Sequence, residues 1–264
     1  ADIRENTQTI DGDPILSEEA IAEFERELPE DVRQTRIHGH FFHLRGLVYQ
    51  EFGEPHLKDF SYSWPDPVIC VLDPHDRNPH HLLWAYIDRD DDVFVDYELI
   101  IRCELPELSK KILTIEKERG YKMKARLIDP NFGRKPASVG TNRTVIQELG
   151  YHSTYFTEAN DNIELGHMLV RDSLHYDRSK PITAVNKPKL FFSRDRAPFT
   201  IRSIRNHQFA EWLGKTKDDR DPKEAQKDKE THGADCVRYL MISRPTWQGF
   251  LSRVKDQELS GVPY

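Results

Sequence analysis

The chain has 264 residues, of which 37% are hydrophobic and 31% charged, and its formal net charge is −7. This length can bury a substantial core, and no apolar run is long enough to span a membrane. The acidic balance argues against a general nucleic-acid coat, because proteins that neutralise many phosphates usually carry a basic excess. It remains compatible with a metal-dependent nuclease, which needs clustered acids at its site.

Residues 1–59 are predicted to form a lead segment, separate from the domain that follows. A polar tail precedes a predicted helix over 15–37, for which Ser17 is a suitable N-cap. The aromatic stretch 38–60 predicts short strands or a docking segment. Its histidines, His38, His40 and His43, lack the cysteines or the second ligand pair that a zinc site needs.

From Pro67 onward the pattern is that of a sheet. Strands are predicted over 68–73, 81–88 and 93–100, and their short connections indicate an antiparallel meander. The acidic run 88–92 lacks the spacing of a calcium-binding loop and predicts a solvated hairpin turn. An amphipathic helix over 105–120, ending at Gly120, then allows a parallel crossover into a strand over 123–129.

The second half alternates between helices and strands. The predicted elements are a helix over 142–150, a strand over 153–159, a helix over 162–176, a strand over 189–193, a helix near 198–210, a charged loop over 215–230 and a late helix with Asp235. We therefore predict one α/β domain over 60–264. Its mixed central sheet combines the antiparallel three-strand meander with parallel strands and is flanked by helices.

Two apolar runs end in an aspartate followed by proline, VICVLDP at Asp73 and KARLIDP at Asp129. Proline pushes the preceding residue into extended geometry, so both aspartates are predicted to end buried strands. Functional sites of open α/β sheets assemble at that end of the strands. The simpler explanation of each dipeptide is a cap before a turn.

A third acid, Asp235, lies in the helical run HGADCVRYLMI, which is apolar nearly all round. A carboxylate on a buried helix is costly unless it is paired or binds a metal ion. Arg238 is its simple ion-pair partner, whereas His232, on the same face, could be a ligand or carry a proton. His75 could also reach a metal ion, although a histidine at the surface of a turn is the simpler interpretation.

The order of these features resembles the ribonuclease H-like nuclease domain of the large terminase subunit of tailed bacteriophages, which package DNA. HGADCVRYL is similar to that family's late motif H-x-x-D-A-x-R-Y, with Cys236 in place of the alanine. VLDPH, HLLWAYID and VFVDYEL resemble its opening hairpin. The segment FERELPEDVRQTRIHGHFFHLRGLVYQEFG is similar to the link between the packaging ATPase and the nuclease.

The resemblance implies a metal-dependent endonuclease that cuts concatemeric viral DNA, largely without regard to sequence. Asp73, Asp129 and Asp235 match the carboxylates that bind two Mg²⁺ or Mn²⁺ ions, and His232 matches an assisting residue. The implied partners are double-stranded DNA, an ATPase domain of the same full-length chain, the portal protein and the small terminase subunit. The implied location is the host cell cytoplasm, with a monomeric isolated domain. No G-x-x-x-x-G-K-[ST] motif is present, so the chain is not the motor itself.

Basic residues near the predicted site indicate how DNA is held. Phosphate contacts that do not read sequence are predicted for Arg134, Lys135, Arg143, Lys187, Lys189, Arg194, Arg196 and Arg202. Two alternatives stay open. Another ribonuclease H-like nuclease, such as a junction resolvase or recombinase, would share the three acids. A docking module without chemistry would fit the net charge and the aromatic segment 37–50.

The cysteines, Cys70, Cys103 and Cys236, are odd in number and widely spaced. Their apolar surroundings predict reduced thiols in the core of a cytosolic protein, and neither disulfides nor a zinc site.

Overall fold

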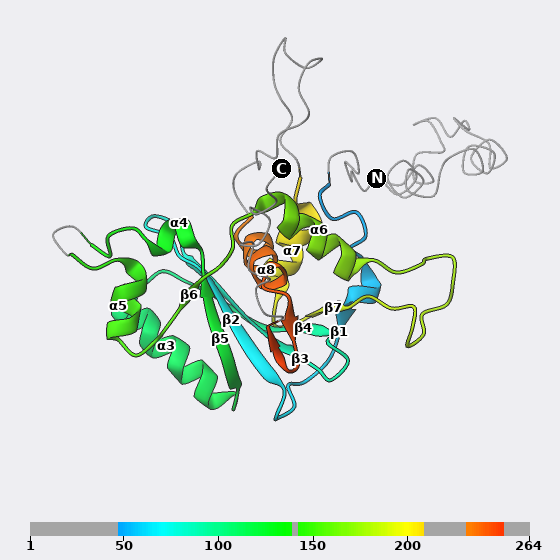
Figure 1. Cartoon of the computed structure of the whole chain (residues 1–264), viewed down its shortest axis with the longest axis horizontal. Helices are drawn as coiled ribbons and strands as arrows, with labels where there is room; N and C mark the ends of the chain where they lie inside the picture. Colours follow the sequence, from blue (N-terminus) through cyan, green and yellow to red (C-terminus); the bar gives the residue numbers. More distant parts are fainter. Residues whose placement is uncertain (1–46, 139–141, 209–230, 251–264) are drawn as a thin grey trace, which may run out of the picture. The chain divides into compact units, whose positions relative to one another are not determined.

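A seven-stranded mixed sheet forms the centre of the computed structural model (Figure 1). The structure describes residues 47–138, 142–208 and 231–250, and those from Val48 onward belong to one compact unit. The helix predicted over 15–37, the histidines His38, His40 and His43, and the loop predicted over 215–230 lie outside the described residues.

The strand order in the sheet is β1-β7-β4-β3-β2-β5-β6. Strands β2, β3 and β4 form the predicted antiparallel meander, and the remaining neighbours pair in parallel. The mixed sheet predicted from the sequence is therefore confirmed. The bounds are β1 Leu57–Lys58, β2 Pro67–Asp73, β3 His80–Ile87, β4 Val93–Ile101, β5 Lys122–Ile128, β6 Thr157–Glu158 and β7 Leu190–Ser193.

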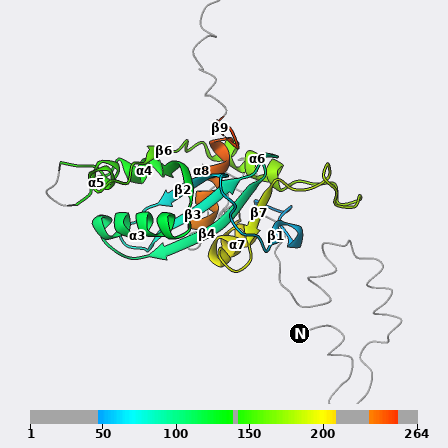
Figure 2. The same cartoon turned by 90° about the horizontal axis from the view of Figure 1, so that it is seen from below.

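Helices cover both faces of the sheet. Helices α3 and α5 pack on one face, and α6, α7 and α8 pack on the other (Figures 1 and 2). The bounds are η2 Glu54–His56, α3 Leu105–Glu118, α4 Pro130–Gly133, α5 Val145–Tyr151, α6 Ile163–Leu174, α7 Pro198–Asn206 and α8 His232–Ile242; strands β8 Pro245–Thr246 and β9 Gly249–Phe250 pair separately. Among the residues described, no helix combines the length and apolar character needed to cross a membrane.

The burial of strand β2 explains why its sequence is a continuous apolar run. All its residues are buried, because successive side chains enter different layers. Ile69 and Val71 join the core beneath α6 to α8, whereas Cys70 and Leu72 join the core beneath α3 and α5. All three cysteines are free thiols; Cys70 and Cys236 lie in the core, as predicted, whereas Cys103 is half-buried.

The strand predicted over 153–159 is much shorter in the structure, where β6 covers only Thr157–Glu158. Its first residues instead close the end of α5. The backbone N–H of Thr154 donates to the carbonyl of Leu149 (3.0 Å), and Ser153 has a φ of 66°. The chain thus completes a helix-terminating turn before it reaches the sheet, which the β propensity of the segment does not indicate.

Glu98, on β4, fixes the start of α7. Its buried carboxylate accepts hydrogen bonds from the backbone N–H groups of Phe199 and Thr200 (2.7 and 2.8 Å), and His81 lies 3.6 Å from it. A carboxylate is well suited to this place, because the first N–H groups of a helix have no partner within the helix. Burial opposes ionisation of Glu98, but the hydrogen bonds from His81 and Thr200 outweigh it and lower its pKa.

Replacing Glu98 with glutamine is expected to lower the free energy of unfolding by about 2 kcal/mol at pH 7, since hydrogen bonds to a charged group are lost. Because the folded-state pKa is lowered, this stabilisation is present above the unfolded pKa and disappears as the pH falls through the folded value. Urea unfolding of Glu98→Gln and wild type between pH 7 and pH 3 should therefore show converging stabilities. A difference that stays constant over this range would contradict the role of the charge.

Candidate functional site

Asp73 and Asp129 lie at the carboxyl ends of two neighbouring strands. Asp73 is the last residue of β2, and Asp129 directly follows β5. The two strands pair in parallel, with Leu72 opposite Ile128, and the N–H of Asp129 donates to the carbonyl of Leu72 (3.1 Å). The Asp129 carboxylate also accepts from the N–H of Asn131 (3.0 Å) and so caps the start of the short helix α4.

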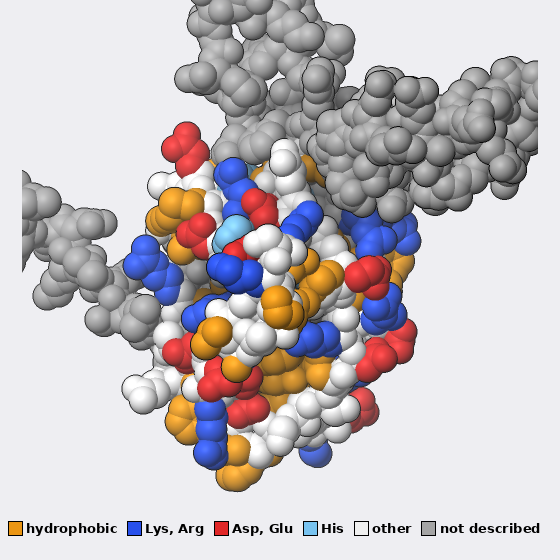
Figure 3. Space-filling view, turned by 90° about the vertical axis from the view of Figure 1, so that its right-hand side faces the viewer, with side chains coloured by type: hydrophobic (Ala, Val, Ile, Leu, Met, Phe, Trp, Pro, Cys, Tyr) orange, Lys and Arg blue, Asp and Glu red, His pale blue; other side chains and the backbone are white. Residues whose placement is uncertain are grey.

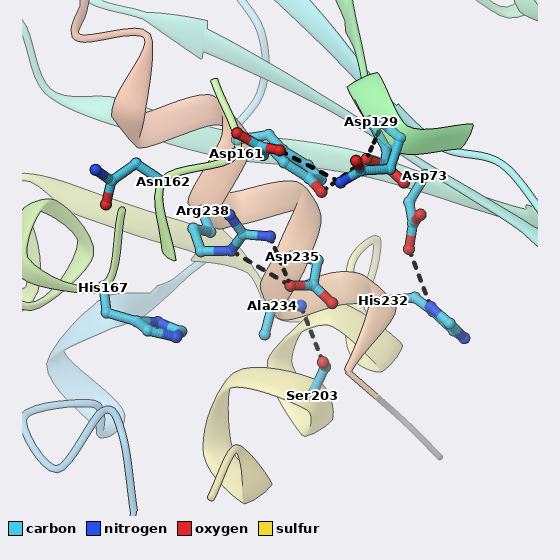
Figure 4. Close-up of polar contacts among 12 residues, drawn as sticks. Asp73, Asp129, Asp161, Asn162, His167, Ser203, His232, Ala234, Asp235 and Arg238 are labelled. Carbon is cyan, nitrogen blue, oxygen red and sulfur yellow. Dashed lines mark hydrogen bonds and ion pairs between the residues drawn. The ribbon is translucent and has the colours of Figure 1, made fainter. Parts of the chain in front are cut away.

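One face of α8 touches both of these aspartates. Near the start of the helix, Nδ1 of His232 lies 2.9 Å from Oδ2 of Asp73. Two turns later, the hydroxyl of Tyr239 donates to Oδ1 of Asp129 (3.0 Å). Asp235 lies three residues after His232 and four before Tyr239, a spacing that places all three on one side of a helix. Asp235 therefore lies on the helix face that spans the two strand ends (Figure 4).

A glycine lets α8 approach α7 closely enough to take this position. A Cβ added at Gly233 would come within 2.8 Å of the Cα of Thr200, so any larger residue would push the helices apart. Next to it, the N–H of Ala234 donates to Oγ of Ser203 (2.9 Å), as Figure 4 shows. The sequence HGAD thus anchors the first turn of α8 with His232 and Asp235 on its site-facing side.

Asp73 is buried, with a side chain 7% exposed, and it stays ionised because imidazoles surround it. Nε2 of His75 lies 3.1 Å from the same Oδ2 that contacts His232. Burial opposes the charge, but the hydrogen bonds from His232 and His75 outweigh it and hold the pKa of Asp73 below its ordinary value. The strand end thus presents a carboxylate at neutral pH.

The donor chemistry around Asp73 suits a divalent metal ion. Asp73, His75 and His232 each offer one ligand atom, and these atoms lie within 4.8 Å of one another. Carboxylate oxygen and imidazole nitrogen are ordinary ligands of divalent metals. His75 lies in the loop after β2, and its partly exposed ring packs against Phe132 while Nε2 contacts Asp73.

Asp235 pairs with Arg238, the simple structural partner that the sequence suggests (3.1 Å). The arginine side chain is 5% exposed and that of Asp235 is 14% exposed. Gly166, on α6, makes room for the arginine, because a Cβ at this position would overlap its side chain. The pair holds the Asp235 carboxylate in place on α8.

The predicted candidates do not include Tyr239, although the motif comparison contains an R-Y pair. Its hydroxyl stays protonated, because burial raises its pKa, so it can act as a donor to Asp129. Asp161 was also missed. It accepts from the Asn131 side chain (3.4 Å) and thereby lies close to Asp129 (Figure 4). No sequence pattern marks Asp161, which lies in the loop before α6.

The basic residues predicted to contact DNA fall into two groups. Those that follow Asp129 in the chain already have partners: Arg134 pairs with Glu158, Arg143 with Glu148, and Lys135 lies over the ring of Phe132. Arg134 and Arg143 are nevertheless about half exposed or more, so water competes with these pairs.

The second group lies before and after β7, a strand that β4 and β3 separate from β2. Three of these residues pair with acids, Lys187 with Asp92, Arg194 with Glu54 and Arg196 with Asp96. Arg202 lies over the ring of Phe199, and Lys189 precedes β7. On the face drawn in Figure 3, basic and acidic side chains are interspersed.

No protein-family model matches this sequence. The curated proteins likewise contain no matching sequence.

The fold, in contrast, matches solved structures. The large terminase of a thermophilic bacteriophage superimposes with a TM-score of 0.56 at 16% identity, covering 88% of this chain and 54% of that protein. The P22 large terminase nuclease domain gives a TM-score of 0.53 at 14% identity, covering 76% of this chain and 93% of that domain. The chain thus spans about half the length of the thermophilic phage's terminase. The ribonuclease H-like fold of terminase nuclease domains, predicted from the motifs, is confirmed.

Proposed function

We propose that this chain is the nuclease domain of a phage large terminase and cuts double-stranded DNA with the help of divalent metal ions. The observation that carries the proposal is the face of α8, where His232 and Tyr239 contact Asp73 and Asp129 with Asp235 between them. The same fold in the P22 large terminase nuclease domain supports it.

In this proposal Asp73, Asp129 and Asp235 hold two Mg²⁺ or Mn²⁺ ions. Bound there, the ions would supply an activated water and stabilise charge during an in-line displacement at phosphorus. The protein contributes rigidity: adjacent strands fix Asp73 and Asp129, the Tyr239 hydroxyl orients Asp129, and Arg238 orients Asp235. His232 contacts Asp73, and in this proposal it would carry a proton next to the reacting phosphate.

DNA would approach over the side of the molecule that carries α4. Arg134, Lys135 and Arg143 follow Asp129 closely in the chain, so we assign them the phosphate contacts nearest the cut. Lys187, Lys189, Arg194, Arg196 and Arg202 would contact the duplex farther away. Because these contacts reach the phosphates, binding should depend strongly on salt and little on sequence.

The proposal includes the surroundings of the domain. Residues 1–59 would lead from an ATPase domain of the same full-length protein, and the portal protein and small terminase subunit would be partners in genome packaging. The place of action would be the host cell cytoplasm.

The first test is cleavage of supercoiled plasmid by the chain alone. We expect slow, nonspecific nicking and linearisation with Mn²⁺ or Mg²⁺ and none with a chelator, because the carboxylates without cations repel phosphate. A branched junction of the same length is the discriminating substrate. Cutting confined to the junction would favour a resolvase, and no cutting of either DNA with either ion would contradict the nuclease proposal.

Replacing Tyr239 with phenylalanine should lower the cleavage rate about tenfold, because groups that orient a metal ligand are typically worth that much or more. The ring and its packing are retained, so the variant removes only the hydroxyl, with its hydrogen bond to Asp129 and its interaction with the Arg238 side chain. Tyr155→Phe is the matched control, since this tyrosine is 72% exposed. Equal rates for both variants and wild type would show that the hydroxyl does not support the site.

A further inference from the structure

Two imidazole nitrogens lie against one carboxylate oxygen at the end of β2. Oδ2 of Asp73 is 3.1 Å from Nε2 of His75 and 2.9 Å from Nδ1 of His232. In the parts of the chain that the structure describes, no other three residues of ligand type bring their donor atoms within 4.8 Å of one another. The three donors come from separate places, a strand end, the following loop and a helix start.

The distances between the Asp73 oxygen and the two histidine nitrogens fit ligands of a single ion. Donor atoms at right angles around an octahedral ion, with bonds of about 2.0–2.1 Å, lie about 3 Å apart. The separations between Asp73 and each histidine are close to this value. The rings of His75 and His232 also contact each other, with centroids 3.9 Å apart, and their side chains are 20% and 28% exposed. An ion can therefore reach the donors from solvent.

Nitrogen ligands discriminate between ions. Mg²⁺ prefers oxygen and gives up its water reluctantly, whereas imidazole binds transition metals well, and affinity for such sites rises from Mn²⁺ to Zn²⁺. Asp129 has different neighbours, the hydroxyl of Tyr239 and the N–H of Asn131. The surroundings of the two strand-end aspartates thus favour different ions.

We infer that His75 and His232 bind one divalent cation together with Asp73, and that they make this position prefer Mn²⁺ and Zn²⁺ over Mg²⁺. The inference rests on the proposed function, because it assigns a ligand set to one of the same aspartates. Each histidine binds through the nitrogen that otherwise donates to Asp73, so that nitrogen gives up its proton to solvent or to the other ring nitrogen when the ion enters.

The test is Mn²⁺ binding to the whole 264-residue chain without DNA, followed by electron spin-echo spectroscopy of the bound ion. Wild type should show two directly coupled nitrogens, and His75→Phe should show one while keeping a ring against Phe132. His75→Gln is a second variant with a polar side chain. Both should bind Mn²⁺ on the order of 10- to 100-fold more weakly, with a smaller change for Mg²⁺. His175→Phe, at an exposed histidine after α6, is the matched control.

The inference fails if wild type shows no nitrogen coupling, if both His75 variants keep two couplings, or if Mg²⁺ displaces Mn²⁺ as effectively as Zn²⁺ does. Since no DNA is present, this outcome is independent of cleavage. Nitrogen couplings without plasmid cutting would contradict the nuclease proposal alone, and cutting without couplings would contradict the ligand assignment alone.

Discussion

Asp73→Asn is expected to reduce plasmid cleavage about a thousandfold, because losing a metal-binding carboxylate removes several kcal/mol of charge stabilisation and about 1.4 kcal/mol is worth a factor of ten. Asparagine has the size of aspartate and can still accept hydrogen bonds from His75 and His232. The fold should therefore remain intact. Initial rates at saturating Mn²⁺ measure the effect.

Asp129→Asn should cause a loss of similar size, because Asp129 lies at the neighbouring strand end. The matched control is Asp76→Asn, which removes the same charge from an exposed position in the loop after β2. If both site variants cut as fast as the Asp76 variant, the carboxylates do not hold the reacting ions. Unchanged unfolding by urea would show that the losses are not caused by misfolding.

The positions of Asp73 and Asp129 could be predicted because they depend on local rules. An apolar run stopped by Asp-Pro gives a buried strand with a carboxylate at its end, and a helical connection makes the two strands parallel. The contact between Tyr239 and Asp129 could not be predicted in this way. It depends on how α8 packs across the sheet, which a close approach at Gly233 determines.

The partners of the basic residues likewise could not be predicted from the sequence. A run of arginines and lysines in the sequence suggests a free positive surface, but acidic partners distant in the chain meet several of them. Lys187 pairs with Asp92, and Arg196 with Asp96 of the neighbouring strand β4. The sequence contains all these charges, yet only the order of the strands determines which of them become neighbours.

The variant Arg238→Met tests whether Asp235 has a role besides the ion pair with Arg238. Without metal ions, it should lower the free energy of unfolding by about 3 kcal/mol, because the largely buried Asp235 carboxylate loses its guanidinium partner. Methionine keeps the apolar contact with α6. The double variant Asp235→Asn/Arg238→Met should regain most of this stability, because a neutral amide needs no counterion. Urea unfolding with a chelator measures both.

Measurements of Mn²⁺ stabilisation and of plasmid cleavage then distinguish a structural role of Asp235 from a role in binding metal ions. Mn²⁺ should stabilise Arg238→Met more than wild type, because a cation replaces the missing guanidinium. It should not rescue Arg126→Met, which breaks a comparable pair with Glu116 in the layer of α3. The double variant, although stable, should cut plasmid about as poorly as Asp73→Asn. Cleavage at the wild-type rate would mean that Asp235 is structural and that the two strand-end aspartates act without it.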